Sequence, residues 1–177
     1  DSGVPPRTVA NYVEILKDTL LAYEVLPFTG SKKRKAISRS KLYLFDVGVA
    51  NQLAGRYPIQ LRTESAGKAF EHWMMNEVRA YLSYSGSRQP LRYWRTQTQH
   101  EVDLILGAEV AIEFKLTRSV GASDLKGLLA LQEEQLFKKY YVVSNDPALR
   151  QLEAGITILP SREFLQRLWA GWLATPK

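Results

Sequence analysis

The segment His100–Thr117, HEVDLILGAEVAIEFKLT, constrains the fold more than any other part of the chain. Its apolar residues and the central Gly107 predict two β-strands joined by a tight turn, and therefore a hairpin within a sheet. Three charged residues, Asp103, Glu113 and Lys115, nevertheless lie inside these strands. Because burying an unpaired charge costs several kcal/mol, these side chains need either solvent or a partner.

Side chains alternate between the two faces of a strand, which predicts how these charges are arranged. We expect Asp103 to share a face with Glu101 and Ile105, and Glu113 to share a face with Lys115. A register that brings Asp103 close to Glu113 makes two carboxylates repel unless a cation lies between them. The alternative is an ordinary solvent-exposed polar face, and the spacing alone leaves both interpretations open.

A divalent cation such as Mg²⁺ or Mn²⁺ is the hard ion that two carboxylates hold, together with water and substrate phosphate oxygens. A nearby lysine such as Lys115 can orient or activate a water and stabilise charge at a phosphoryl centre. The hairpin therefore supports the hypothesis of a metal-dependent site for phosphodiester hydrolysis.

Composition narrows the class of protein further. The 177 residues include no cysteine and two histidines, which excludes disulfides and thiolate metal sites and disfavours zinc. No apolar run approaches the ~20 residues of a membrane helix, and no signal-peptide pattern is present. We expect a cytoplasmic protein without a membrane partner.

The basic charge is concentrated in residues 1–62, which hold ten Lys/Arg against five Asp/Glu. A helix beginning near Thr8, a basic turn and a strand follow one another, an order typical of a small winged-helix-like subdomain that binds DNA. The alternative is a solvated charged hairpin beside a core helix. The candidate nucleic-acid-binding residues are Lys32, Lys33, Arg34, Lys35, Arg39 and, further along the chain, Arg95.

A linker around Pro58 predicts a boundary near residue 62 and a second domain over residues 63–177. Apolar spacing predicts a long helix over 64–86, followed by three strands, a helix, two strands and a final helix. We therefore expect an α/β (α+β) fold, with a mixed sheet flanked by helices.

The unit Asp103…Glu113-Phe-Lys115, after a helix that carries Glu71, resembles the PD-(D/E)XK nuclease superfamily and its restriction-endonuclease-like fold. The resemblance implies that Asp103 and Glu113 are metal ligands and Glu71 a supporting ligand. It implies that Lys115 assists the attacking water, so all four residues are catalytic candidates. Val102 stands where the literal motif has proline.

A second resemblance covers nearly the whole chain. Segments such as KLYLFDVGVANQL, GKAFEHWMMNEV and IEFKLT are similar to the C-terminal region of prokaryotic AAA-type ATPases, a domain of unknown function. It implies an N-terminal ATPase domain as partner, and the start at Asp1 suggests part of a longer protein. No P-loop occurs here, since Gly67-Lys68 lacks the upstream glycine and is followed by Ala69, so we expect no ATP site.

Three functions remain open from the sequence. The first is a DNA-acting, metal-dependent nuclease-like domain. The second is a catalytically silent DNA- or protein-binding regulatory module of the ATPase. The third is an assembly domain, a homo-oligomer for example, in which the final helix with Trp169 and Trp172 forms the contact.

Overall fold

The computed structural model describes residues 3–173. Its helices are α1 (Pro6–Asp18), α2 (Val47–Leu53), α3 (Glu64–Tyr84), a 3-10 turn η1 (Ala122–Leu125), α4 (Lys126–Gln132) and α5 (Ser161–Trp169). Its strands are β1 (Ala22–Pro27), β2 (Lys41–Leu44), β3 (Leu91–Arg95), β4 (Glu101–Leu106), β5 (Val110–Lys115), β6 (Lys139–Ser144), β7 (Arg150–Gln151) and β8 (Ile156–Pro160). Within these residues no helix has both the length and the hydropathy that crossing a bilayer requires.

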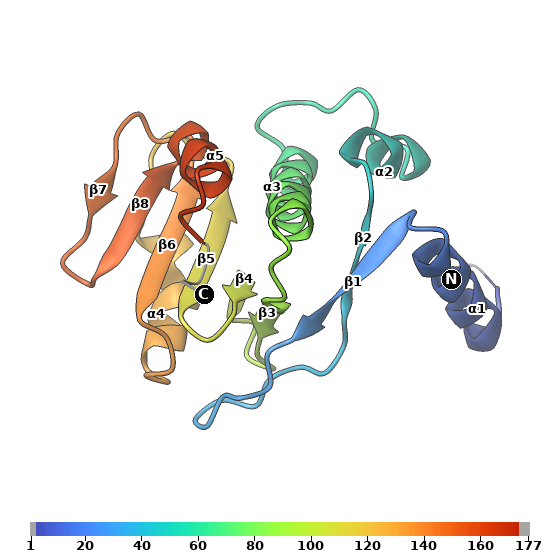
Figure 1. Ribbon diagram of the computed structural model, residues 1–177, viewed down its shortest axis with the longest axis horizontal. Coiled ribbons are helices and arrows are strands. Elements are labelled where there is room, and N and C mark those ends of the chain that lie inside the picture. The colour runs from blue at the N-terminus through green and yellow to red at the C-terminus, as the bar shows by residue number, and fades with distance from the viewer. Residues whose placement is uncertain (1–2, 174–177) are drawn as a thin grey trace.

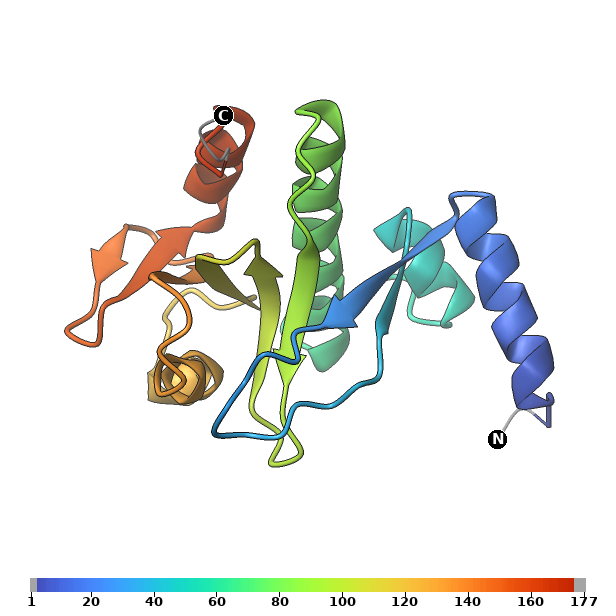
Figure 2. The same cartoon turned by 60° about the horizontal axis from the view of Figure 1, so that its bottom comes forward.

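The strands of the described part form one mixed sheet in the order β2-β1-β3-β4-β5-β6-β8-β7. The strands β5, β6 and β8 are parallel, whereas β3, β4 and β5 pair antiparallel. Helices α3 and α5 cover one face of the sheet and α4 covers the other (Figures 1 and 2). The prediction of a mixed α/β sheet with helices on its faces is confirmed.

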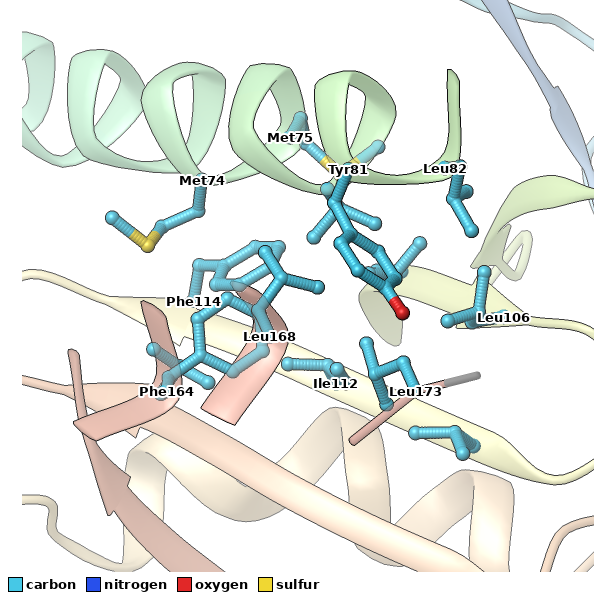
Figure 3. Close-up of a cluster of buried hydrophobic side chains, with 14 of the residues drawn as sticks. Met74, Met75, Tyr81, Leu82, Leu106, Ile112, Phe114, Phe164, Leu168 and Leu173 are labelled. Atoms are coloured by element: carbon cyan, nitrogen blue, oxygen red, sulfur yellow. The ribbon is translucent and has the colours of Figure 1, made fainter. Parts of the chain in front are cut away.

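Each face of the sheet carries its own hydrophobic layer. Under α3 and α5, Met74, Phe114, Phe164 and Leu168 are buried and lie against one another (Figure 3). Under α4, a second cluster contains Leu128 and the fully buried Trp94. Since burial of one large apolar side chain contributes about 1.5–3 kcal/mol, these two layers hold the central strands in place. The strands β4 and β5 are therefore fixed from both sides.

The first part of the chain is attached to this sheet through β1. Strand β1 pairs antiparallel with β2 and parallel with β3, where Leu26 lies opposite Arg92. Helix α1 has no buried residue and lies at the outer end of the β1–β2 pair (Figure 2). The first part of the chain has the order helix–strand–strand, and the strands on either side of residue 62 share one sheet.

Several element boundaries differ from the sequence prediction. Helix α1 begins after Pro5 without a side-chain cap, two residues before Thr8. Helix α2 was not predicted; it begins after Asp46, whose carboxylate accepts the Val49 N–H at 2.7 Å. The short edge strand β7 was not predicted. Local capping chemistry and edge pairing leave only weak signals in the apolar pattern.

Candidate functional site

A register shift in β4 creates the local geometry of the site. Arg92 lies opposite Ile105 and Trp94 lies opposite Val102, which leaves Asp103 and Leu104 together opposite one residue of β3. Such bulges kink a strand and re-aim its side chains. As a result both faces of the hairpin are buried, and Ile105 packs under α4, not on a charged face. The expectation of strict alternation along β4 is wrong for this reason.

The paired strands β4 and β5 separate next to Asp103. Their Cα pairing runs from Leu106↔Val110 to Leu104↔Ile112 and does not include Asp103. In place of a backbone carbonyl, the Asp103 carboxylate accepts the Phe114 N–H at 2.9 Å. The side chain thus fills the position of a sheet hydrogen bond, and the two strands open into a pocket.

All four predicted catalytic residues line this pocket, which has a volume of about 680 Å³. Glu71 comes from α3, Asp103 from β4, and Glu113 and Lys115 from β5. The lining consists of Lys41, Leu42, Tyr43, Glu64, Lys68, Glu71, His72, Arg95, Glu101, Asp103, Glu113 and Lys115. The structure brings these charged groups together from four strands and one helix.

Lys41, the first residue of β2, is the residue of this pocket that sequence reasoning missed. Its ammonium lies 2.6 Å from Glu101 Oε1, 2.8 Å from Glu71 Oε1 and 3.4 Å from Asp103 Oδ1. Lys41 follows the basic residues 32–39 and is not among the candidate residues named from the sequence. Lys41 begins a strand, whereas the other basic residues precede that strand. This position was the sequence signal that could have separated Lys41 from them.

The Glu113 carboxylate is only half satisfied. Its Oε1 forms an ion pair with Lys115 Nζ at 2.6 Å. Its Oε2 is buried and has no hydrogen-bond partner among residues 3–173. Because a buried anionic oxygen without a partner is costly, this atom indicates a missing positive charge or donor in the pocket.

The pKa values of the acidic side chains in the pocket reflect their burial and their charged neighbours. Burial, followed by repulsion from Glu71, raises the pKa of Asp103 to about 6. Burial and repulsion from Asp103 raise the pKa of Glu113 well above its ordinary value. Burial opposes ionisation of Glu71 too, but attraction and hydrogen bonding by Lys41, the hydrogen bond from Tyr43 and attraction by Lys115 together lower the pKa of Glu71. The negative charge is therefore least compensated at Asp103 and Glu113.

Lys41 and Lys115, the pocket lysines that contact Asp103 or Glu113, stay charged. Burial disfavours their ammonium forms, but attraction by Asp103 and Glu71 raises the pKa of Lys41, and attraction by Glu113 raises the pKa of Lys115. An ammonium with a raised pKa donates hydrogen bonds and stabilises negative charge, and it is a poor proton acceptor at neutral pH. This property favours an electrostatic role for Lys115.

The donor set fits a divalent cation held by two carboxylates. Within residues 3–173, no three His, Cys, Asp or Glu side chains are grouped so as to hold a metal ion. Mg²⁺ needs only one or two carboxylates, with water and substrate oxygens completing its shell. Asp103 and Glu113, with the unpaired Oε2, supply such a pair. Glu71 lies in the same pocket, but its Oε1 is already bound by Lys41 and Tyr43.

The predicted basic residues lie mainly in the loop between β1 and β2. The carboxylate of Glu134, on the segment after α4, accepts the backbone N–H groups of Lys32 and Lys33, each at 2.8 Å. Arg34 pairs with Glu133 and donates to a carbonyl of α4. The exposed basic side chains of the loop are Lys32, Lys33, Lys35 and Arg39. The loop is thus held against α4 and the segment after it, and four cationic side chains are exposed to solvent.

Two other candidates occupy distinct environments. Arg95, at the end of β3, lines the pocket and lies 3.5 Å from Glu101. Trp172 packs against Tyr141 and Phe164 in the core, whereas Trp169 remains 48% exposed and donates to Glu77. Arg95 is therefore part of the charged pocket, and Trp169 is the residue of this pair that a partner could reach.

Comparison with known proteins adds two family matches and two relatives. The family model described as Domain of unknown function (DUF4143) matches residues 66–164, and that of Domain of unknown function (DUF8612) matches residues 1–60. Uncharacterized proteins of Mycobacterium tuberculosis (Rv2008c) and Mycobacterium bovis (Mb2031c) are each 28% identical over 141 residues. These alignments cover 75% of this chain but only 31% of each relative. No solved structure matches the chain.

Proposed function

The chain belongs to the DUF4143 family of domains of unknown function, and we propose that its pocket hydrolyses a phosphodiester bond of DNA with Mg²⁺ or Mn²⁺. One observation carries this proposal. Two buried carboxylates, Asp103 and Glu113, adjoin a protonated Lys115, and the Glu113 Oε2 has no partner among residues 3–173. Asp103 and Glu113 would hold a divalent cation here, and this cation would supply the positive charge that the arrangement lacks.

Each residue has a distinct part in the proposed reaction. Asp103 and Glu113 would hold the cation, which supplies Lewis-acid polarisation of the phosphate and a more acidic bound water. The backbone N–H of Phe114 fixes the Asp103 carboxylate at 2.9 Å. Lys115 donates a hydrogen bond toward the phosphoryl oxygens and stabilises the negative charge that develops there. Glu113 in turn orients Lys115 through their 2.6 Å ion pair.

The proposed DNA contact uses charges outside the pocket. The exposed Lys32, Lys33 and Lys35 project from the held loop and match the regular negative charge of a phosphate backbone. Arg95 lines the pocket itself and would contact a DNA phosphate there. These contacts are sequence-independent, so the proposal is for a DNA-acting site without base readout.

The proposal also includes an ATPase partner. The relatives are longer than the aligned segment, since it covers 31% of each. An N-terminal ATPase domain in the same polypeptide is what the family resemblance predicts. Limited proteolysis of the full-length protein, followed by an ATP hydrolysis assay of each fragment, tests this part of the proposal.

The cleavage test compares the parent chain with Asp103→Asn and Lys115→Met on linear, nicked and forked DNA. Mg²⁺- or Mn²⁺-dependent cleavage is expected in the parent, with a loss of about 10²–10³-fold for Lys115→Met. The control is Lys138→Met, because Lys138 is an exposed lysine paired with Glu109 away from the pocket. Cleavage at parental rates by both pocket variants would refute the assigned chemistry.

A second candidate is a DNA- or protein-binding regulatory module without catalysis. The observation that favours it is the Lys41 ammonium, which compensates part of the acidic cluster from within the chain. This candidate expects salt-sensitive DNA binding without cleavage. In Lys32→Glu/Lys33→Glu the slope of log K against log salt should become shallower by about 2. The same slope in Lys138→Glu/Lys139→Glu, matched in charge change, should remain that of the parent.

A further inference from the structure

The Lys41 ammonium lies where three acidic side chains converge. The three carboxylates come from two elements: Glu71 belongs to α3, and Glu101 and Asp103 belong to β4. Only 20% of the Lys41 side chain is exposed, and its ammonium also lies 5.1 Å from the centre of the Tyr93 ring. Oxygen atoms surround this ammonium as they would surround a bound cation.

This ammonium contacts one of the two carboxylates proposed to hold the metal. Lys41 lies 3.4 Å from Asp103 Oδ1, while Oδ2 of the same carboxylate is occupied by the Phe114 N–H. Oδ1 is therefore the Asp103 oxygen that a divalent cation would use. An ammonium and a metal ion on one oxygen repel each other strongly in a partly buried pocket.

We infer that Lys41 and the divalent cation compete for Asp103, so that Lys41 is a positioning residue that sets the metal affinity of the site. The inference rests on the proposed function and deepens it. Without metal, Lys41 holds Glu71, Glu101 and Asp103 together and prevents their mutual repulsion. When metal binds, the flexible lysine stem lets the ammonium withdraw toward Glu71 and Glu101 without moving β2.

Competition has a consequence for loading of the site. A substrate phosphate adds ligands to the metal and can also accept a hydrogen bond from the released ammonium. Metal and DNA then bind with positive coupling, because each favours the arrangement in which Lys41 has left Asp103. Lys41 therefore lowers the affinity of the pocket for metal alone and for DNA alone, relative to its affinity for the two together.

The test is titration of Mn²⁺ by calorimetry into the parent chain, Lys41→Met and Lys68→Met. Methionine keeps the apolar stem of lysine and removes its charge. Lys68 lines the same pocket but pairs with Glu64 and contacts none of the cluster carboxylates. We expect Lys41→Met to raise the Mn²⁺ affinity by about tenfold or more. Lys68→Met should change it less than about threefold, as exposed charges do.

The outcomes separate this inference from the proposed function. Binding of Mn²⁺ by parent and Lys41→Met with equal affinity overturns the competition and leaves the metal site standing. No binding in either protein overturns both. If Lys41→Met fails to fold, the parent decides: Mg²⁺ should shift the ¹³Cε resonance of Lys41 and leave that of Lys68 in place. A Lys41 resonance that stays constant during saturation with Mg²⁺ overturns the competition.

Discussion

At the scale of single residues, Gly127 holds α4 close to the pocket. A Cβ at this position would lie 1.8 Å from the backbone oxygen of Glu101, which cannot move without displacing β4. Because Glu101 binds Lys41, this close approach also fixes one wall of the carboxylate cluster. The glycine is therefore required by contact between two backbones, not by its own torsion angles.

We predict that Gly127→Ala lowers the free energy of unfolding by about 1–3 kcal/mol, the usual effect of overpacking. Chemical denaturation measures this change. The matched control is Gly67→Ala in the interior of α3, where a Cβ meets no atom within 4 Å. That substitution should be neutral or stabilise by about 0.5–1 kcal/mol. Equal stability of Gly127→Ala and the parent would show that α4 does not need this contact.

Residue identity predicted part of the site. Asp103, Glu113 and Lys115 were found because charges inside an apolar hairpin are unusual, and the structure gathers them in one pocket. Lys41 was missed because a lysine in a basic run looks like every other lysine there. Its contact with Asp103, 62 positions later in the chain, belongs to the folded structure. Periodicity carries no signal for contacts of this length.

At the scale of elements, the basic loop between β1 and β2 depends on Glu134. This fully buried carboxylate accepts two backbone N–H groups of the loop, and Arg34 lies 3.8 Å from its other oxygen. The Trp94 indole N–H donates to Ser31 at the start of the same loop. Anchored at both positions, the loop presents its lysines in a fixed arrangement.

We predict that Glu134→Ala lowers the free energy of unfolding by about 1–3 kcal/mol, because two donors lose their buried acceptor. Amide exchange at Lys32 and Lys33 should accelerate more than exchange in α3. The control is Glu133→Ala, whose carboxylate is 59% exposed and pairs only with Arg34. That change should cost less than about 1 kcal/mol. Slow exchange at both lysines in Glu134→Ala would contradict the anchoring role.

Elements with strong periodic patterns were predicted best. The apolar stripe of α3 gave its bounds closely, and Thr63 caps its start through the Ala66 N–H. The shift in β4 escaped prediction because one extra residue opposite β3 follows from pairing between strands, not from the β4 sequence. That shift directs the Asp103 side chain into the pocket. The sequence therefore predicted Asp103 as a site residue but not the direction of its side chain.

At the scale of the whole molecule, the acidic pocket makes stability depend on pH. Asp103 has a folded pKa of about 6, raised chiefly by burial, whereas an unfolded aspartate titrates near ~3.9. Between these values the folded state binds more protons than the unfolded state. The contribution of this group to the free energy of unfolding therefore increases as the pH falls through about 6 and levels off below about 4.

We predict that this contribution is on the order of 2 kcal/mol between pH 7 and pH 4. Denaturant titrations of the parent and of Asp103→Asn across this range measure it as the difference between the two curves. Titrating groups distant from Asp103 are common to both proteins and cancel, whereas Glu113, whose pKa is raised by the Asp103 charge, adds to the difference. Parallel stability curves for the two proteins would mean that burial and repulsion from Glu71 do not raise the pKa of Asp103.

The arrangement of the whole sheet could be predicted only in outline. The apolar patterns predicted a mixed sheet with helices on its faces, and the structure has this architecture. The parallel pairing of β1 with β3, which joins the first 62 residues to the rest, has no local signature. Yet that pairing brings Lys41 to the pocket, since β2 follows β1 at the sheet edge. The complete charge set depends on the fold of the whole chain.

The measurement that tests the central claim most directly is diffraction at the manganese absorption edge from crystals soaked in Mn²⁺. We predict an anomalous peak in the pocket, from a Mn²⁺ ion bound by Asp103 Oδ1 and Glu113 Oε2 at the distance of about 2.1 Å that is usual for hard cations. Asp103→Asn crystals, soaked in the same way, should lose the peak. A saturating soak that leaves Asp103 bound only to Lys41, with no peak in the pocket, would contradict a divalent-cation site and with it the proposed hydrolysis.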